Sequence, residues 1–260
     1  MIIEIIELIL MGVFTGMITG LTGASGVVIV VPLVNLLLDF TIHEAIGTSL
    51  IVDTIAPLAI SATYYKYGNI DIRSSIWIAV GSMTGAQIGA FLVTGISGTS
   101  LGSFFGIFMV IMGIIMFKQG INREAIANRF NSVLKIEKTS QKIMVSILIG
   151  LALGIITGVI GAGGGVMILI VLIFVLGFPL QKAIGTSALI MAITTFSGSI
   201  GYAIHGNINV LSGIIIGIGA IVGGIGSARF ANRVDEKSLG KVVASIFIIL
   251  GLFLTVLTIV

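Results

Sequence analysis

Long apolar runs, interrupted by glycine-rich and charged stretches, dominate this chain. Each half divides into five apolar segments, at 5–22, 27–40, 48–65, 74–94 and 101–117 and then at 143–160, 166–180, 186–204, 210–228 and 242–260. Apolar runs of this kind predict membrane helices. We therefore predict an all-α polytopic membrane protein with a first transmembrane repeat over 1–117, a linker over 118–142 and a second transmembrane repeat over 143–260.

The two halves repeat one another without insertion or deletion. The segment from Gly16 to Ser49 reads again from Gly154 to Ser187, an offset of 138 residues that continues through Tyr64 and Tyr202. The repeated glycines break otherwise continuous apolar sequence. In transporters, paired interruptions of this kind frame the binding site. The repeat is therefore the first indication of function.

Composition supports a membrane location and excludes several kinds of chemistry. Hydrophobic residues make up 57% of the chain, charged residues only 9%, and the mean hydropathy is +1.25. A soluble surface needs about a quarter of charged residues. The absence of cysteine excludes disulfides, thiol catalysis and cysteine-ligated metals. Residues 1–10 contain Glu4 and Glu7 but no basic residue, so we expect a retained helix rather than a cleaved signal peptide.

The charges of the loops predict how the two repeats face the membrane. The linker 118–142 has six basic residues (Lys118, Arg123, Arg129, Lys135, Lys138 and Lys142) against Glu124 and Glu137. The positive-inside rule places such a loop in the cytoplasm. The same rule explains the net charge of +3, so we predict no nucleic-acid partner.

Corresponding loops of the two halves differ in charge. Lys66 and Arg73 stand where the second half has the uncharged stretch 205–207, whereas the uncharged stretch 94–100 corresponds to a loop with Arg229, Arg233, Lys237 and Lys241. We therefore predict inverted repeats in the plasma membrane, with both termini outside. Either five crossings per half or three crossings plus a re-entrant pair satisfies this topology.

Segment 27–40 would form a helix of about 21 Å, shorter than the roughly 30 Å hydrocarbon core. At least one of its ends is therefore expected inside the membrane. We favour the glycine loop as the recessed end, because burying Glu44 or its counterpart Lys182 at mid-depth would be expensive.

The glycine loops before the second segments are candidate anion sites. Each loop places a helix start with several N–H donors beside irregular backbone, and helix N-termini favour anions. The Gly-Thr-Ser segments that open the third apolar segments repeat this design and add hydroxyl groups. The predicted substrate-binding residues are Thr19, Gly23, Ala24, Ser25, Gly26, Gly47, Thr48, Ser49, Thr157, Gly161, Ala162, Gly163, Gly164, Gly165, Gly185, Thr186 and Ser187. The alternative is that these small residues only allow helices to cross closely.

Asp53 is the acidic residue that lies clearly inside an apolar run, and its counterpart is Met191. An intramembrane carboxylate is costly when charged and is a functional candidate. We predict that Asp53 takes up a proton during transport; the alternative is a structural hydrogen bond. His43 and His205 have no metal-site spacing, and no catalytic arrangement is visible, so we predict no enzyme activity, no cofactor and no metal. Gln87 is a candidate either to line a cavity or to bond between helices.

The paired Gly20-x-x-Gly23-Ala24-x-Gly26 and Gly158-x-x-Gly161-Ala162-Gly163-Gly164-Gly165 segments, each followed by Ala-Ile-Gly-Thr-Ser, resemble the TauE/SafE family of sulfite and organosulfonate exporters, also described as 4-toluene sulfonate uptake permeases. The resemblance extends over almost the whole chain, although Ser25 and Val27 stand where the second loop has Gly163 and Gly165.

The resemblance implies transport of a small sulfur-containing or carboxylated anion, with export favoured. We therefore predict a secondary transporter that exposes a central site alternately to the two sides and has a small anion and the lipid bilayer as partners. A passive anion channel and a membrane-embedded enzyme are the alternatives. The oligomeric state stays open.

Overall fold

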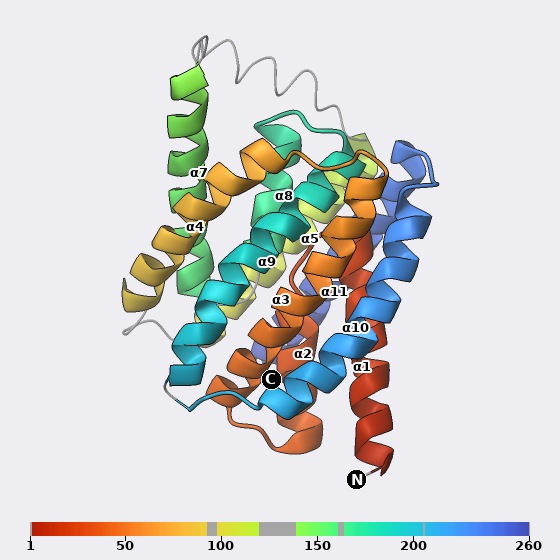
Figure 1. Ribbon diagram of the computed structural model, residues 1–260. Coiled ribbons are helices and arrows are strands. Elements are labelled where there is room, and N and C mark those ends of the chain that lie inside the picture. Colours follow the sequence, from red (N-terminus) through yellow and green to blue (C-terminus); the bar gives the residue numbers. More distant parts are fainter. Residues whose placement is uncertain (1, 93–97, 120–138, 161–163, 205, 260) are drawn as a thin grey trace.

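All regular elements of the described residues are α-helices. The computed structural model describes residues 2–92, 98–119, 139–160, 164–204 and 206–259. Its helices are α1 (Ile2–Thr22), α2 (Val27–Leu38), α3 (Ile42–Lys66), α4 (Ile72–Leu92), α5 (Gly98–Gln119), α7 (Thr139–Ile160), α8 (Gly164–Phe174), α9 (Leu180–Ile204), α10 (Val210–Ala231) and α11 (Glu236–Ile259) (Figure 1). The predicted all-α fold is confirmed.

Several of these helices are long and apolar enough to cross a membrane. Among the described residues, five stretches meet that condition: Ile3–Thr22, Ile42–Lys66, Leu180–Ile204, Val210–Ala231 and Glu236–Val256. Large aliphatic side chains also cover the outer surface, including Leu10, Leu211 and Val222, which are all more than half exposed. An apolar surface of this extent is stable only in contact with lipid. The chain is a multi-pass membrane protein.

Two helices are short and buried. Helix α2 has 12 residues and α8 has 11, which gives lengths of about 18 and 17 Å against a hydrocarbon core of roughly 30 Å. Val30 and Val34 of α2 and Leu169 and Leu172 of α8 are fully buried by the longer helices. The prediction of short helices that follow glycine loops is confirmed, and α2 begins at the predicted residue, Val27.

Contacts between the halves follow the sequence repeat. Helix α1 packs along α10, and α7 packs along α4 (Figure 1). A β-carbon placed at Gly12 would lie 2.0 Å from the carbonyl oxygen of Ile216, and one placed at Gly150 would lie 2.1 Å from that of Ile78. Gly150 is the repeat equivalent of Gly12, and Ile78 is the repeat equivalent of Ile216, each 138 positions away. A glycine of the first half therefore packs on a helix of the second half in the same way as the equivalent glycine of the second half packs on a helix of the first.

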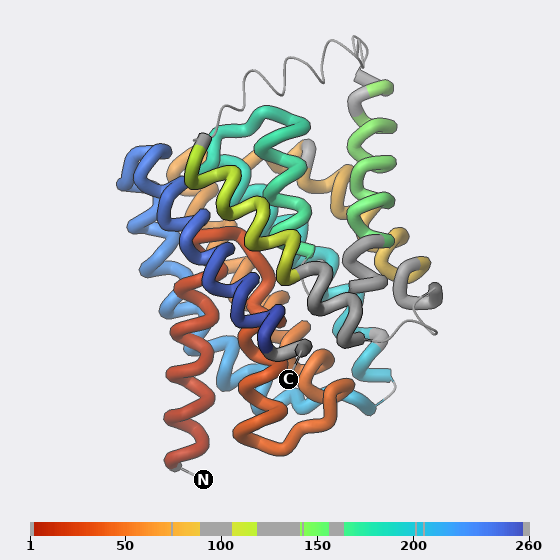
Figure 2. The backbone as a smooth tube through the Cα atoms, turned by 180° about the vertical axis from the view of Figure 1, so that it is seen from behind, coloured from red at the N-terminus to blue at the C-terminus, as the bar shows by residue number. Residues whose placement is uncertain are grey.

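Equivalent helices also pack against each other, and they run in opposite directions. Leu50 lies next to Gly198, and the hydroxyl oxygens of Thr54 and Thr195 are 3.2 Å apart, so residue numbers rise along α3 as they fall along α9. Helices α5 and α11 cross in the same antiparallel sense (Figure 2). Antiparallel packing of equivalent helices is what inverted repeats require. The orientation of each half in the bilayer stays a prediction.

The third helices begin earlier than the sequence suggests. Thr41 caps α3, because its side chain accepts a hydrogen bond from the Glu44 backbone N–H, and α9 begins at Leu180, whose N–H donates to the Glu236 carboxylate over 2.9 Å. Gly47 and Gly185 therefore lie inside helices, and the expectation that they open them is wrong. A β-carbon at Gly47 would lie 1.9 Å from the Asn207 carbonyl oxygen, so this glycine allows close approach of a neighbouring loop.

Candidate functional site

A cavity of about 380 Å³ lies where the two halves meet, a volume within the range of small-molecule sites. Its wall comes from the loop before α2, the first residue of α2, and from α3, α4, α8, α9 and the loop after α9. The lining residues are Ser25, Val27, His43, Ile46, Leu50, Ser82, Met83, Ala86, Gln87, Gly164, Gly165, Ile168, Met191, Thr194, Thr195, Ser197, Gly198, Tyr202 and Asn207. Within the described part of the chain, neutral hydroxyl and amide groups supply most of the polar lining, and no Asp, Glu, Lys or Arg contributes.

The starts of the two short helices meet at this cavity. A β-carbon placed at Gly165 would lie 2.7 Å from both the Gly23 carbonyl oxygen and the Ser25 backbone nitrogen. The first turn of α8 therefore touches the loop that leads into α2. Since the first N–H groups of a helix have no acceptor within the helix, both starts bring positive partial charge to one place.

The first glycine loop is held in a fixed conformation. Gly23 has a φ of +64°, which favours glycine, and a β-carbon there would lie 2.2 Å from the Ser187 hydroxyl oxygen. That hydroxyl lies 2.9 Å from the Ile184 carbonyl of its own helix and 3.3 Å from the Gly23 carbonyl, and its one proton can go to either. Ala24 is buried, and its backbone N–H donates to the Thr22 hydroxyl. The loop of one half therefore packs against a serine of the other half.

The Asp53 carboxylate lies behind the cavity wall and accepts hydrogen bonds at the start of α2. It is 1% exposed and accepts from the Ser25 hydroxyl and, over 2.9 Å, from the Gly26 N–H. The Ser25 oxygen in turn accepts from the Val27 N–H over 3.2 Å. Thr19 is buried beside this group. At the equivalent position of the other half stands Met191, which cannot supply a carboxylate, so the two helix starts differ.

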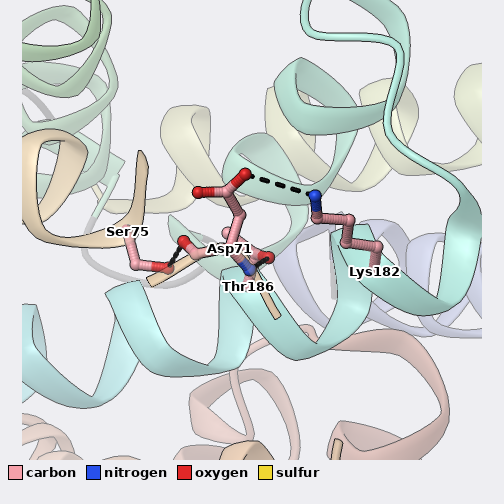
Figure 3. Close-up of polar contacts among 4 residues, drawn as sticks. All are labelled: Asp71, Ser75, Lys182 and Thr186. Atoms are coloured by element: carbon pink, nitrogen blue, oxygen red, sulfur yellow. Dashed lines mark hydrogen bonds and ion pairs between the residues drawn. The ribbon is translucent and has the colours of Figure 1, made fainter. Parts of the chain in front are cut away.

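The Gly-Thr-Ser hydroxyls lie behind the wall rather than in it. The Thr186 oxygen accepts from the Asp71 N–H over 3.1 Å (Figure 3). With the halves exchanged, the Thr48 oxygen accepts from the Asn209 N–H over 3.0 Å. Ser49 donates to a carbonyl of its own helix. Thr48 and Thr186 therefore hold the loops that enter α10 and α4, and none of the Gly-Thr-Ser residues lines the cavity.

Replacing Thr186 with Val should lower the free energy of unfolding by about 1–3 kcal/mol, because the Asp71 N–H would lose its acceptor. Denaturation of the purified variant in mixed micelles would measure this change. Thr84→Val is a suitable control, since the Thr84 hydroxyl donates to its own helix and is exposed. An unchanged stability of the Thr186 variant would show that the bond contributes nothing.

Of the predicted site residues, Ser25, Gly164 and Gly165 lie in the cavity wall. Gly161, Ala162, Gly163 and the side chain of Thr157 lie outside the described residues. Sequence reasoning weighed Gln87 as a cavity residue, and the cavity includes it. It missed the hydroxyl groups of Ser82, Thr194, Thr195 and Ser197, which belong to no motif.

Ser82 is the missed residue with the clearest chemical signal. Its side chain is fully buried at the cavity wall, and its hydroxyl has no hydrogen-bond partner within the described residues. A buried hydroxyl normally has a partner. Ser82 is therefore suited to bond a molecule in the cavity. No group of three or more potential metal ligands occurs in the described part of the chain.

The fold and the cavity define a multi-pass helical membrane protein with a central cavity, largely apolar but bearing several hydroxyl and amide groups, beside the starts of two buried half-length helices. The model of the Sulfite exporter TauE/SafE family matches residues 8–254, and the chain belongs to this family.

Curated relatives are membrane transporters by name. The chain is 28% identical to the probable membrane transporter protein YunE of Bacillus subtilis, with 94% of each chain covered. It is 26% identical to the probable membrane transporter protein MJ0441 of Methanocaldococcus jannaschii, over 95% of this chain and 94% of the relative. A probable membrane transporter protein of Xylella fastidiosa is 29% identical, with 93% and 91% covered. No solved structure gave a significant match.

Proposed function

We propose that this protein is a secondary transporter that binds a small anion, of the sulfite or organosulfonate type, in the central cavity. The observation that carries the proposal is the meeting of two helix starts, one from each half, at a cavity whose polar groups are mainly neutral hydroxyls and amides. N–H groups at helix starts bind anions without a buried cation. The start of α2 is already closed by Asp53, so the start of α8 and the Ser82 hydroxyl are the main donors for the substrate.

The two ends of the molecule differ in a way that supports alternating access. The cavity reaches the exposed His43, together with Tyr202 and Asn207, and we call this the cavity end. The equivalent residues in the other half are Gln181, Tyr64 and Asn69, which we call the packed end.

Side chains fill the packed end. Tyr64, Ile184 and Ala188 are fully buried there, and the Tyr64 hydroxyl donates to the Gly20 carbonyl. Their equivalents Tyr202, Ile46 and Leu50 line the cavity instead. A site open at one end and closed at the other by equivalent elements is expected for one state of an alternating-access transporter.

Polar contacts hold the packed end together. The Lys182 ammonium lies 3.2 Å from the Asp71 carboxylate (Figure 3), and the Asn69 amide donates to the side chain of Asn232 over 2.6 Å. At the cavity end the equivalents of Asp71 and Lys182 are Asn209 and Glu44, which cannot form an ion pair. Asymmetric closing contacts of this kind support an unequal stability of the two states.

The topology in the plasma membrane follows from the basic linker. With the linker in the cytoplasm and both termini outside, the cavity end faces outside, because α3 begins at the end of the molecule where the N-terminus lies (Figure 1). The family name favours export of a sulfur-containing anion. Asp53 is the candidate proton carrier, since it is a buried carboxylate one hydroxyl away from the cavity.

A thermal-shift screen of the purified protein tests the proposal. Sulfite, thiosulfate, 4-toluenesulfonate and simple carboxylates are compared with neutral dimethyl sulfone at equal concentration. A bound anion should raise the unfolding temperature, since ligand at about 100 times its Kd stabilises by about 2.7 kcal/mol. Stabilisation by no anion, or equally by the neutral sulfone, would contradict an anion site.

A further inference from the structure

We propose that Ser25 is the residue that couples the proton to the anion, because its single hydroxyl proton can serve either Asp53 or a molecule in the cavity. Ser25 lines the cavity, and its hydroxyl also donates to the Asp53 carboxylate. Asp53 itself does not line the cavity. The inference rests on the proposed function and adds how proton and anion binding are linked.

The hydrogen bonds of Ser25 define its state when Asp53 is ionised. A hydroxyl has one proton and accepts up to two hydrogen bonds. The proton is directed to Asp53, and one acceptor position takes the Val27 N–H. The remaining lone pair is the group that Ser25 can offer to the cavity. An anion meets this lone pair and, behind it, the negative charge of Asp53, and both oppose its binding.

Protonation of Asp53 reverses the direction of this bond. The carboxyl O–H then donates to the Ser25 oxygen, while the Gly26 N–H continues to donate to the other carboxyl oxygen. The Ser25 oxygen accepts from Asp53 and from Val27, so its own proton is free to point into the cavity. All groups keep their partners, and the cavity gains one donor and loses a nearby negative charge. Proton binding therefore strengthens anion binding, and the linkage is reciprocal.

Among the groups around the Asp53 carboxylate, this carboxylate is the one that takes up the proton. Besides Ser25 and Gly26, it faces Thr15 and Thr19 of α1 beside Gly26, and its backbone carbonyl accepts from Thr195 of α9. None of these groups ionises. The charged residues on the helices around it lie near helix ends: Glu4, Glu7, Asp39, Glu44, Lys66, Lys182 and Arg229. His43 and Tyr202 are the titratable side chains in the cavity wall.

Because proton binding strengthens anion binding, the proton and the anion are transported together in the same direction. An inward proton gradient would then drive uptake, and export would occur when the outward gradient of the anion is larger. The direction of transport therefore depends on the two gradients together.

Calorimetric titration with 4-toluenesulfonate at pH 6 and pH 8 tests the inference, because a sulfonate stays ionised at both values. The purified full-length protein should bind more tightly at pH 6, by up to about tenfold per pH unit for one linked proton. In weakly buffered solution at pH 8, binding should take up close to one proton per anion.

Three variants separate Ser25 and Asp53 from other causes. Asp53→Asn keeps both hydrogen bonds and frees the Ser25 proton at every pH, so it should bind at pH 8 at least as tightly as the unchanged protein binds at pH 6, without proton uptake. Ser25→Ala should bind more weakly at pH 6, and adding it to Asp53→Asn should reduce the gain at pH 8 to the part that comes from the lost negative charge. His43→Gln, which introduces the residue of the equivalent position, and Ser197→Ala should keep the proton uptake.

Proton uptake that persists in Asp53→Asn, or a gain at pH 8 that Ser25→Ala leaves undiminished, would overturn the inference. So would sulfonate binding to the unchanged protein without proton uptake, which would leave the proposed anion site intact. If neither 4-toluenesulfonate nor sulfite binds to the unchanged protein or to Asp53→Asn, the proposed function fails and the inference fails with it.

Discussion

Gly165→Ala is expected to reduce anion transport by roughly tenfold to a hundredfold, because the new methyl group would separate the two helix starts that form the site. A β-carbon at this position would lie 2.7 Å from the backbone of both Gly23 and Ser25 and 2.9 Å from the Met191 sulfur. The methionine can move, but two backbone contacts from a buried loop cannot both yield. Overpacking of this kind also costs about 1–3 kcal/mol of stability.

Flux of labelled anion into proteoliposomes, normalised to reconstituted protein, measures the effect. Gly226→Ala is the matched control, since this glycine also lies in a membrane helix but a β-carbon there would meet nothing within 4 Å. It should transport normally and be equally or slightly more stable, because alanine favours a helix over glycine. Equal flux through both variants would show that close contact of the two helix starts is not required.

The sequence could predict where α2 begins, whereas α8 begins at Gly164, two residues before the predicted segment, and the third helices begin earlier still. Val27 follows a loop with three residues of low helix propensity, two glycines and a serine, so the interruption between helices is visible in the sequence. Gly47 looks like a similar break. In the structure, capping by Thr41 starts α3 earlier, and Gly47 lies inside the helix, where its missing side chain leaves room for the backbone of Asn207. A single glycine in an apolar run is compatible with either role, and tertiary packing decides between them.

The cavity wall was predictable to the extent that it depends on the repeated loops, which contribute Ser25 and Gly165. Asp53 stands out in the sequence because a carboxylate within an apolar run is rare, and its function stays a prediction. Ser82 and Thr194 were missed because α4 and α9 bring them to the cavity, and serine or threonine in a membrane helix often only bonds to its own helix. The partner of Asp53 could not be found from sequence, because it lies 28 residues away and on another element.

Lys182→Glu is expected to increase the accessibility of the packed end about fivefold, because it replaces the ion pair with Asp71 by two carboxylates. The side chains of Lys182 and Asp71 are 33% and 26% exposed, so solvent screening limits the contribution of the pair to about 1 kcal/mol. Charge exchange in the double variant Asp71→Lys, Lys182→Asp should restore the original behaviour. Since the chain has no cysteine, a single cysteine introduced at Gln181 reports accessibility to a membrane-impermeant maleimide.

Adding an ion pair at the cavity end should close that end. Glu44→Lys with Asn209→Asp would place an ion pair at the cavity end equivalent to that of Asp71 and Lys182, because all four positions are related by the repeat. Labelling of a cysteine introduced at His43 should then fall about fivefold, and flux should fall with it, since about 1 kcal/mol shifts a two-state population by that factor. Glu44→Lys alone is the control and should leave labelling near its original rate. If the added pair changed neither labelling nor flux, the ion pair would have no part in selecting which end is open.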